Sequence, residues 1–153
     1  MEFIHEYRVE AIGAVGRNGV VHAEGILPAI SFSPPPEFQG EVGRWTPEHL
    51  LVAAVASCFI STFEGMAQTS RLEFNSLRLA AEGVLTKQDS GWRFSEIRLR
   101  PTVTLRKEED RDRAVRLLEK AEKSCLVARS LECEVALFPA MKVGEELSVL
   151  TKV

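Results

Sequence analysis

The pattern of apolar and polar positions in the N-terminal part of the chain predicts β-strands. Residues 3–12 have a two-residue period from Tyr7 onward, as a half-buried strand does. The turn residues Gly16-Arg17-Asn18-Gly19 follow, and residues 20–24 are the predicted return strand of a hairpin.

A short third strand is expected over residues 29–33, and prolines occupy the three positions 34–36 directly after it. Because proline offers no backbone N–H, regular strand pairing is expected to stop there. The next segment, residues 37–45, contains Gly40 and Gly43 and is predicted to be a loop.

A long helix is predicted to begin at Thr46. Threonine suits the N-cap, Pro47 suits the first helical position, and Glu48 suits the positive end of the helix dipole. The helical pattern continues to about Gln68. Because the helix is apolar on nearly every side through Ile60, we expect other elements to enclose it.

The second half of the chain predicts a further hairpin, formed by residues 75–86 and 91–106. The remaining predicted elements are a helix over 108–123, a short helix over 125–130, a strand over 132–138 and a strand over 146–151. The order βββ-α-ββ-α-α-β(β) is an α+β arrangement. A length of 153 residues predicts one domain, 1–153.

Charge and composition narrow the function classes. A net charge of −3 argues against a nucleic-acid-binding protein, which needs a basic surface. No signal peptide is recognised, and the longest apolar run, residues 50–60, is shorter than the roughly 20 residues that a membrane span takes. We therefore expect a cytoplasmic protein, in which cysteines are inert, metal-binding or redox-active. No CxxC pair or His/Cys cluster is present, so neither a metal nor an organic cofactor is predicted.

Two cysteines are candidates for chemistry. Cys58 lies in the apolar run, and Cys125 follows a charged helical stretch, near the junction of two predicted elements. A thiol peroxidase needs one thiol to attack the peroxide and a second to resolve the product as a disulfide. The alternative is that both are small core residues, which is the interpretation we favour for Cys133 in its alternating strand.

A reactive Cys58 would need help to ionise, because the thiolate is the nucleophile. Cys58 lies ~18 Å along the helix axis from its start, too far for the helix dipole to act. Burial among apolar residues raises a thiol pKa, so a cation from elsewhere is expected. The candidates are Arg17, Arg44 and Arg129, each of which could equally be a solvated surface charge.

Two segments resemble the OsmC/Ohr family. Residues 45–59 resemble the helix in which Pro-Glu-x-Leu precedes an alanine-rich run that ends in the reactive cysteine. Residues 121–131 resemble the family's second cysteine motif, and the separation of the two motifs is also similar. The resemblance covers nearly the whole chain, because the strands on either side follow the same order.

The resemblance implies an OsmC-like fold, with antiparallel sheets around a long buried helix, in an intertwined homodimer. It implies a thiol-dependent peroxidase that reduces organic hydroperoxides, and to a lesser degree hydrogen peroxide, in oxidative stress defence. Cys58 matches the peroxidatic cysteine, Cys125 the resolving cysteine and Glu48 the family carboxylate. Arg17 is our choice for the arginine, because residues 16–19 resemble the Gly-Arg-Asp-Gly turn of the Ohr branch. An external dithiol, including a lipoyl-type reductant, is expected to reduce the Cys58–Cys125 disulfide.

The implied dimer has a geometric reason. Glu48 and Cys58 are ten residues apart on one predicted helix, about 15 Å along its axis, so they cannot meet within it. If both act in one site, Glu48 comes from the partner chain. An organic peroxide suits apolar walls, and the predicted lining residues are Phe59, Phe63, Trp45 and Phe38.

Departures from the family pattern leave alternatives open. Leu126 stands where the family usually has proline, and Glu37 stands where the OsmC branch has an arginine. The chain therefore resembles a third branch, distinct from the best-defined OsmC and Ohr groups. The alternative functions are a non-catalytic OsmC-fold protein with a ligand pocket at the dimer interface, and a redox sensor that forms the disulfide without turnover.

Overall fold

The computed structural model describes residues 3–144, so the strand predicted over 146–151 lies outside the described residues. The chain divides into two compact units, Met1–Leu51 and Val52–Val153, which are described separately. Whether the whole chain acts as a single domain stays a prediction.

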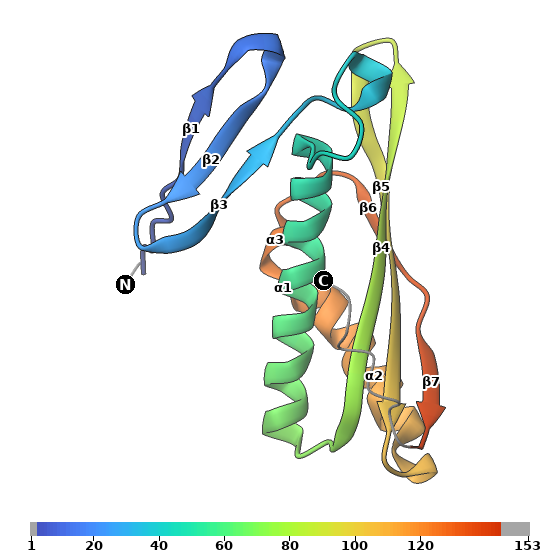
Figure 1. Cartoon of the computed structure of the whole chain (residues 1–153). Coiled ribbons are helices and arrows are strands. Elements are labelled where there is room, and N and C mark those ends of the chain that lie inside the picture. Colours follow the sequence, from blue (N-terminus) through green and yellow to red (C-terminus); the bar gives the residue numbers. More distant parts are fainter. Residues whose placement is uncertain (1–2, 145–153) are drawn as a thin grey trace. The chain divides into compact units, whose positions relative to one another are not determined.

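The first unit contains a three-stranded antiparallel sheet, shown in blue in Figure 1. Its strands are β1 (Glu10–Gly13), β2 (Gly19–Ala23) and β3 (Ile26–Phe32), and the short 3₁₀ turn η1 (Val15–Arg17) connects the first two. The predicted hairpin is therefore confirmed, although β1 is shorter than expected. Glu10 pairs with His22, close to the end of β2, so the residues before Glu10 extend past the strand that could pair with them.

The loop after β3 folds back on its own strand. A second 3₁₀ turn, η2 (Pro36–Phe38), follows the proline run. Ser33 N–H donates to the Trp45 carbonyl at 2.9 Å, and the Ser33 hydroxyl accepts from Glu41 N–H at 2.8 Å. These bonds fix the chain just before the long helix begins.

The predicted long helix is present as α1 (Pro47–Ser70). The N-cap prediction is confirmed, because the Thr46 hydroxyl accepts a hydrogen bond from His49 N–H at 3.1 Å. Its fully buried residues, Val55, Phe59, Phe63 and Ala67, recur every four positions and so form one face of the helix.

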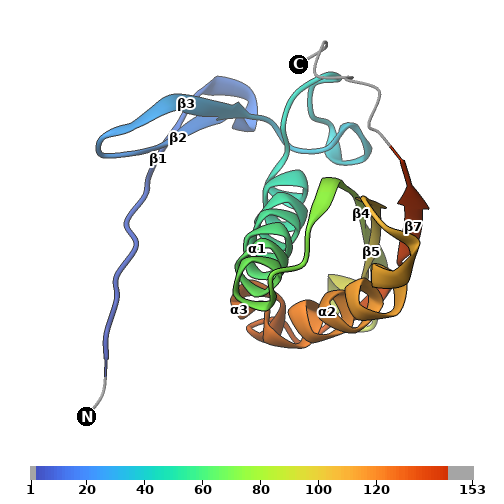
Figure 2. The same ribbon diagram turned by 90° about the horizontal axis from the view of Figure 1, so that it is seen from below.

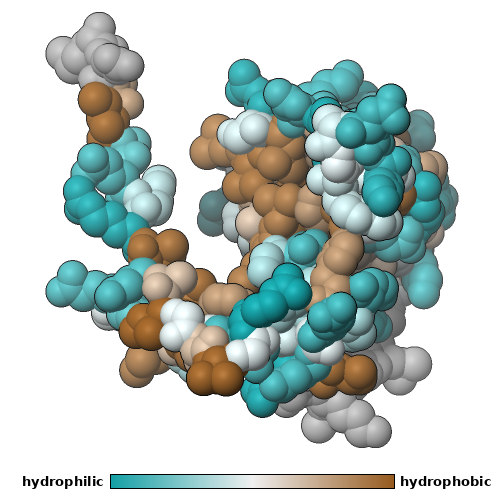
Figure 3. Space-filling model, turned by 90° about the horizontal axis from the view of Figure 1, so that it is seen from above, coloured by the Kyte–Doolittle hydropathy of each residue, from teal (hydrophilic) through white to brown (hydrophobic). Residues whose placement is uncertain are grey.

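Beyond that face, much of α1 is only partly covered. The helix is long and apolar enough to cross a membrane. The core helix of a soluble protein can meet the same two criteria. Only 22% of its apolar stretch is buried within the described chain. Figure 3 shows a broad apolar area, in brown, on one side of the molecule.

The second unit is built on a mixed sheet. Strands β4 (Phe74–Gln88) and β5 (Gly91–Leu105) form the predicted antiparallel hairpin. Two short strands pair in parallel with the other edge of β5. The first, β6 (Glu134–Leu137), pairs with residues 96–99, and the second, β7 (Ala140–Val143), pairs with residues 102–105. The strand β6 was predicted and β7 was not.

Two helices join α1 on one side of this sheet, as Figure 2 shows. The 3₁₀ turn η3 (Glu108–Asp110) leads into α2 (Arg111–Ser124), and α3 (Leu126–Arg129) follows after one residue. Alternate residues of β5, from Ile97 to Leu105, are buried against Leu118 and Ala121 of α2 and the buried face of α1. The α+β class and the long helix packed against the sheet confirm the predicted fold class. Both candidate cysteines lie in this unit.

Candidate functional site

Cys58 lies in the middle of α1 and is half-buried, at the margin of the hydrophobic core. One turn later, the hydroxyl of Thr62 donates a hydrogen bond to the Cys58 carbonyl oxygen at 2.8 Å. Cys58 therefore packs against apolar neighbours and is not fully enclosed by them.

Cys125 is the single residue between α2 and α3, and it is fully buried. Its backbone (φ −61°, ψ 115°) is extended, so the helical path breaks there and resumes at Leu126 in a new direction. Its thiol donates to the carbonyl of Val55 at 3.9 Å, across 70 residues of sequence. This contact brings Cys125 against the turn of α1 that precedes Cys58.

The two thiols interact directly, and their acidities differ. Burial raises the pKa of Cys58, but hydrogen bonds from Val127 N–H, the Cys125 thiol, the Thr62 hydroxyl and Leu126 N–H together hold it below the ordinary value. Cys58 is therefore the group that ionises first.

Cys125 is affected in the opposite direction. Burial, followed by its hydrogen bond and charge interaction with Cys58, raises the pKa of Cys125 to about 11, although N–H groups of Ala128 and Val127 partly oppose this. The arrangement is a thiol of lowered pKa at Cys58 beside a thiol at Cys125 that keeps its proton to higher pH. Such a pair can do nucleophilic and disulfide chemistry.

Arg17 lies in the first unit, in the turn between β1 and β2, with a positive φ of 67°. Its guanidinium donates to the carbonyl oxygen of Phe38 at 3.0 Å, so the turn is tied to η2. Beside it, Glu41 accepts hydrogen bonds from Asn18 at 2.7 Å and from Arg44 at 3.0 Å. The Asn18 bond and then Arg44 lower the pKa of Glu41, which is exposed and stays ionised.

Glu48 and His49 begin α1, within the first unit. One carboxylate oxygen of Glu48, Oε2, is buried and has no hydrogen-bond partner among residues 3–144. The ring of His49 is held by its Nδ1, which lies 2.8 Å from the Thr46 hydroxyl. A buried carboxylate oxygen without a donor is unusual, and a donor outside the described chain would satisfy it.

The predicted apolar lining residues occupy different surroundings. Phe59 and Phe63 are fully buried in the core of the second unit, where the Phe63 ring lies 5.5 Å from that of Phe74. In the first unit, Trp45 is 54% exposed and lines a shallow hollow with His49.

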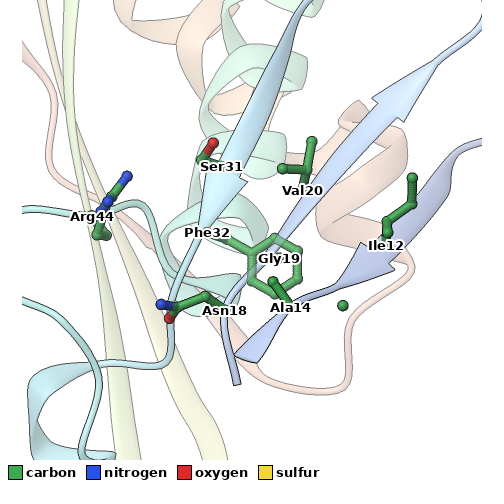
Figure 4. Close-up of a pocket in the computed structure, with 9 residues that line it drawn as sticks. Ile12, Ala14, Asn18, Gly19, Val20, Ser31, Phe32 and Arg44 are labelled. Atoms are coloured by element: carbon green, nitrogen blue, oxygen red, sulfur yellow. The ribbon is translucent and has the colours of Figure 1, made fainter. Parts of the chain in front are cut away.

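A larger hollow of about 380 Å³ lies on the sheet of the first unit. Figure 4 shows the Phe32 ring over Gly19 in this hollow, with Ile12 and Val20 on neighbouring strands. A Cβ at Gly19 would lie 2.6 Å from the Phe32 ring, so glycine is what permits this close approach.

The structure therefore brings Cys58 and Cys125 together, within the second unit. Arg17 and Glu48 belong to the first unit, and their part in the same site stays a prediction. Cys133 packs against the core, as expected for an inert cysteine. Arg129 is exposed at the end of α3. Within residues 3–144 no cluster of three or more His, Cys, Asp or Glu side chains could hold a metal ion.

Sequence reasoning missed the groups that surround Cys58. The expected cation stays a prediction, and the groups that lower the pKa of Cys58 within its own unit are two backbone N–H groups, a hydroxyl and a thiol. Backbone amides carry no residue-type signal. The one available clue was the position of Cys125 at the end of a helical pattern, where a break leaves N–H groups free.

Comparisons with known proteins agree with this architecture. Residues 39–137 match the model of the family described as OsmC-like protein. The uncharacterised protein YmaD of Bacillus subtilis is 30% identical over 149 residues, covering 93% of this chain and 98% of YmaD.

Solved structures show the same fold. An OsmC-like protein of unknown function from Vibrio cholerae superposes with a TM-score of 0.80 at 21% identity, covering 89% of this chain and 99% of that one. An organic hydroperoxide resistance protein OsmC from Legionella pneumophila superposes with a TM-score of 0.74 at 24% identity, covering 93% of this chain and all of the other (100%). The family match over most of the sequence, the YmaD relationship and the shared fold show that this chain belongs to the OsmC-like protein family.

Proposed function

We propose that this protein is a thiol-dependent peroxidase that reduces organic hydroperoxides, with Cys58 as the peroxidatic and Cys125 as the resolving cysteine. The observation that carries the proposal is the contact between two thiols whose pKa values are shifted in opposite directions. The pKa of Cys58 lies below its ordinary value and that of Cys125 at about 11. A half-buried thiolate beside a buried, protonated thiol is the starting arrangement for this reaction.

The reaction proceeds in three balanced steps. The Cys58 thiolate attacks one peroxide oxygen, the O–O bond breaks, and the alkoxide leaves and takes a proton to become the alcohol. Cys58 is then a sulfenic acid. The Cys125 thiol condenses with it, which forms the S–S bond and releases water, and an external dithiol reduces the disulfide to two thiols while it is itself oxidised.

Arg17 and Glu48 are proposed to complete the site in a homodimer. Glu48 and Cys58 belong to the same helix, and ten residues of helix separate them by about 15 Å along the axis. A second copy of the chain would supply Glu48 to this thiol pair. The unpartnered Oε2 of Glu48 and the incompletely covered surface of α1 support a partner at this helix.

The proposed substrates are organic hydroperoxides, because apolar residues surround Cys58 on α1. The name of the structurally similar Legionella protein, an organic hydroperoxide resistance protein, supports this choice. The reductant would be a dithiol or lipoyl-type molecule. We place the protein in the cytoplasm, in defence against oxidative stress.

The test is dithiol-dependent turnover of cumene hydroperoxide by the wild type and by Cys58→Ser. The variant is expected to lose turnover, because a serine hydroxyl does not ionise in this range and is a poor nucleophile. Cys133→Ser is the matched control, since it removes a thiol that contacts neither Cys58 nor Cys125 in the described interactions. Full turnover by Cys58→Ser would end the proposal.

Two other outcomes identify the alternative functions. A Cys58 thiol that reacts with peroxide no faster than free cysteine indicates a non-catalytic OsmC-fold binding protein. A Cys58–Cys125 disulfide that forms but is not reduced by any dithiol indicates a redox sensor.

A further inference from the structure

The turn that carries Arg17 is attached to the loop after β3 at two points. The guanidinium of Arg17 donates to the carbonyl oxygen of Phe38 at 3.0 Å. The side-chain amide of the next residue, Asn18, donates to Oε1 of Glu41 at 2.7 Å. Both contacts lie within the first unit, and they join residues 21 and 23 positions apart in the sequence. The conformation of this turn therefore depends on the loop as well as on its own residues.

Glu41 is the point at which the contacts of the loop meet. Its second carboxylate oxygen, Oε2, accepts a hydrogen bond from Nε of Arg44 at 3.0 Å. Its backbone N–H donates to the hydroxyl of Ser33 at 2.8 Å, and Ser33 is fully buried. The backbone of Glu41 and both of its carboxylate oxygens are thus held by three different residues. The bonds from Asn18 and Arg44 also lower the pKa of Glu41, so it stays an ionised acceptor.

The proline run gives the loop a fixed shape just before Glu41. The N–H of Gly40 donates to the carbonyl oxygen of Pro35 at 3.0 Å. A Cβ at Gly40 would overlap the carbonyl oxygen of Pro34, so only glycine allows the chain to pack this closely on the prolines. Because proline also fixes its own φ, this segment presents Glu41 from a rigid support.

The contact between Asn18 and Glu41 requires an amide at position 18. Asparagine can donate to a carboxylate, whereas an ionised aspartate has no proton to donate. The Ohr-branch turn that residues 16–19 resemble has aspartate at this position. Asn18 and Glu41 are therefore a matched donor and acceptor in this chain.

We propose that Glu41 is a positioning residue for Arg17, which it acts on through Asn18. By holding the turn against the loop, Glu41 keeps the guanidinium in one orientation. The inference rests on the proposed function, in which Arg17 completes the site and a guanidinium can hold a peroxide oxygen. It deepens that function, because it assigns what orients the arginine.

Three variants separate this role from a general effect on the fold. Asn18→Asp replaces the donor with a second carboxylate, which Glu41 repels. The double variant Asn18→Asp/Glu41→Gln places the amide at 41 and the carboxylate at 18, so the hydrogen bond can form again with donor and acceptor exchanged. Gln39→Glu is the matched control, because it adds the same charge to the same loop at an exposed position.

The first measurement is the order of the Arg17 side chain, from the heteronuclear NOE of its Nε–H group by ¹⁵N NMR. Asn18→Asp is expected to make this group mobile, whereas the double variant and Gln39→Glu should keep the wild-type value. Equal order of Arg17 in Asn18→Asp and in the wild type would overturn the inference. No peroxide is used, so this measurement is decisive even for a protein without peroxidase activity.

The second measurement is steady-state turnover with cumene hydroperoxide and a dithiol. Asn18→Asp should lower kcat/KM for the peroxide by about 10- to 100-fold, the effect of a misplaced group, and the double variant should restore it. The value of kcat/KM for the dithiol should not change, because the arginine acts only in the peroxide step. A mobile Arg17 with an unchanged kcat/KM for peroxide, or an equal loss in both constants, would overturn the positioning role. Absence of turnover in the wild type would instead refute the proposed function, and the NMR result would still decide whether Glu41 holds Arg17.

Discussion

The Cys125 thiol lies 3.9 Å from the carbonyl oxygen of Val55, one turn before Cys58 on α1. This contact joins the junction of α2 and α3 to the middle of the core helix. It places the fully buried Cys125 thiol beside Cys58, which is only half-buried.

The first prediction concerns Cys125→Ser. Its Cys58 is expected to react with one equivalent of peroxide and then stop at the sulfenic acid, because no thiol is left to form the intramolecular disulfide. A sulfenic-acid reagent followed by intact mass should detect one adduct per chain. Cys133→Ser should keep wild-type recycling, and sustained wild-type turnover by Cys125→Ser would contradict the resolving role.

The second prediction concerns stability at alkaline pH. Burial raises the pKa of Cys125 from its ordinary value of 9.0 to about 11, so the folded state holds this proton more tightly than the unfolded state does. The resulting stabilisation is complete below about pH 9 and is lost as the pH rises through about 11. It amounts to roughly 3 kcal/mol at most, from two pKa units.

The pKa of Cys58 is shifted the other way, so its contribution is complete above about pH 9 and is lost as the pH falls through its lowered folded value. Denaturant unfolding at a series of pH values separates the two cysteines. Between about pH 9 and pH 11, the free energy of unfolding of Cys125→Ser should fall by less than that of the wild type. Identical curves for Cys125→Ser and the wild type would refute the Cys125 shift.

A third prediction tests whether Phe63 is a residue of the hydrophobic core or lines the substrate pocket. Its ring is fully buried and packs against Phe74, so Phe63→Ala should cost about 3–5 kcal/mol of the free energy of unfolding. Leu126→Ala removes a mostly exposed side chain and should cost no more than about 0.5 kcal/mol. Equilibrium denaturation measures both. A stable Phe63→Ala variant with weakened peroxide binding would instead mark Phe63 as a lining residue of the pocket.

Assembly provides a fourth prediction. Every buried hydrophobic side chain recorded for residues 3–144 belongs to the second unit, and the first unit exposes apolar residues such as Val15, Leu27 and Val42. We expect a homodimer in solution, with a Tm that rises with protein concentration. Light scattering and thermal unfolding at two concentrations test this, and a monomer with a constant Tm would contradict the shared site.

Local sequence signals predicted much of the fold. Thr46 and Pro47 marked the start of α1, and alternation marked the hairpin of β4 and β5. The strand β7 was missed because Ala140–Val143 is short, follows Pro139, and becomes a strand only by pairing with residues 102–105 of β5. No local pattern reports such a distant partner.

Only part of the site could be predicted, because local patterns do not report distant partners. Cys58 and Cys125 stood out as a pair through their two motifs, whereas Thr62 in the middle of a helix resembles any other half-buried threonine. The N–H groups of Leu126 and Val127 matter because of the extended backbone at Cys125, and that is a property of the folded chain.

The most direct test of the account is a stoichiometric titration of the reduced protein with cumene hydroperoxide, following free thiols and intact mass. We predict the rapid loss of two thiols per chain at one equivalent of peroxide, with peptide mapping that locates a Cys58–Cys125 disulfide and leaves Cys133 free. Thiol loss no faster than that of free cysteine, or a disulfide that includes Cys133 in place of Cys125, would contradict the account.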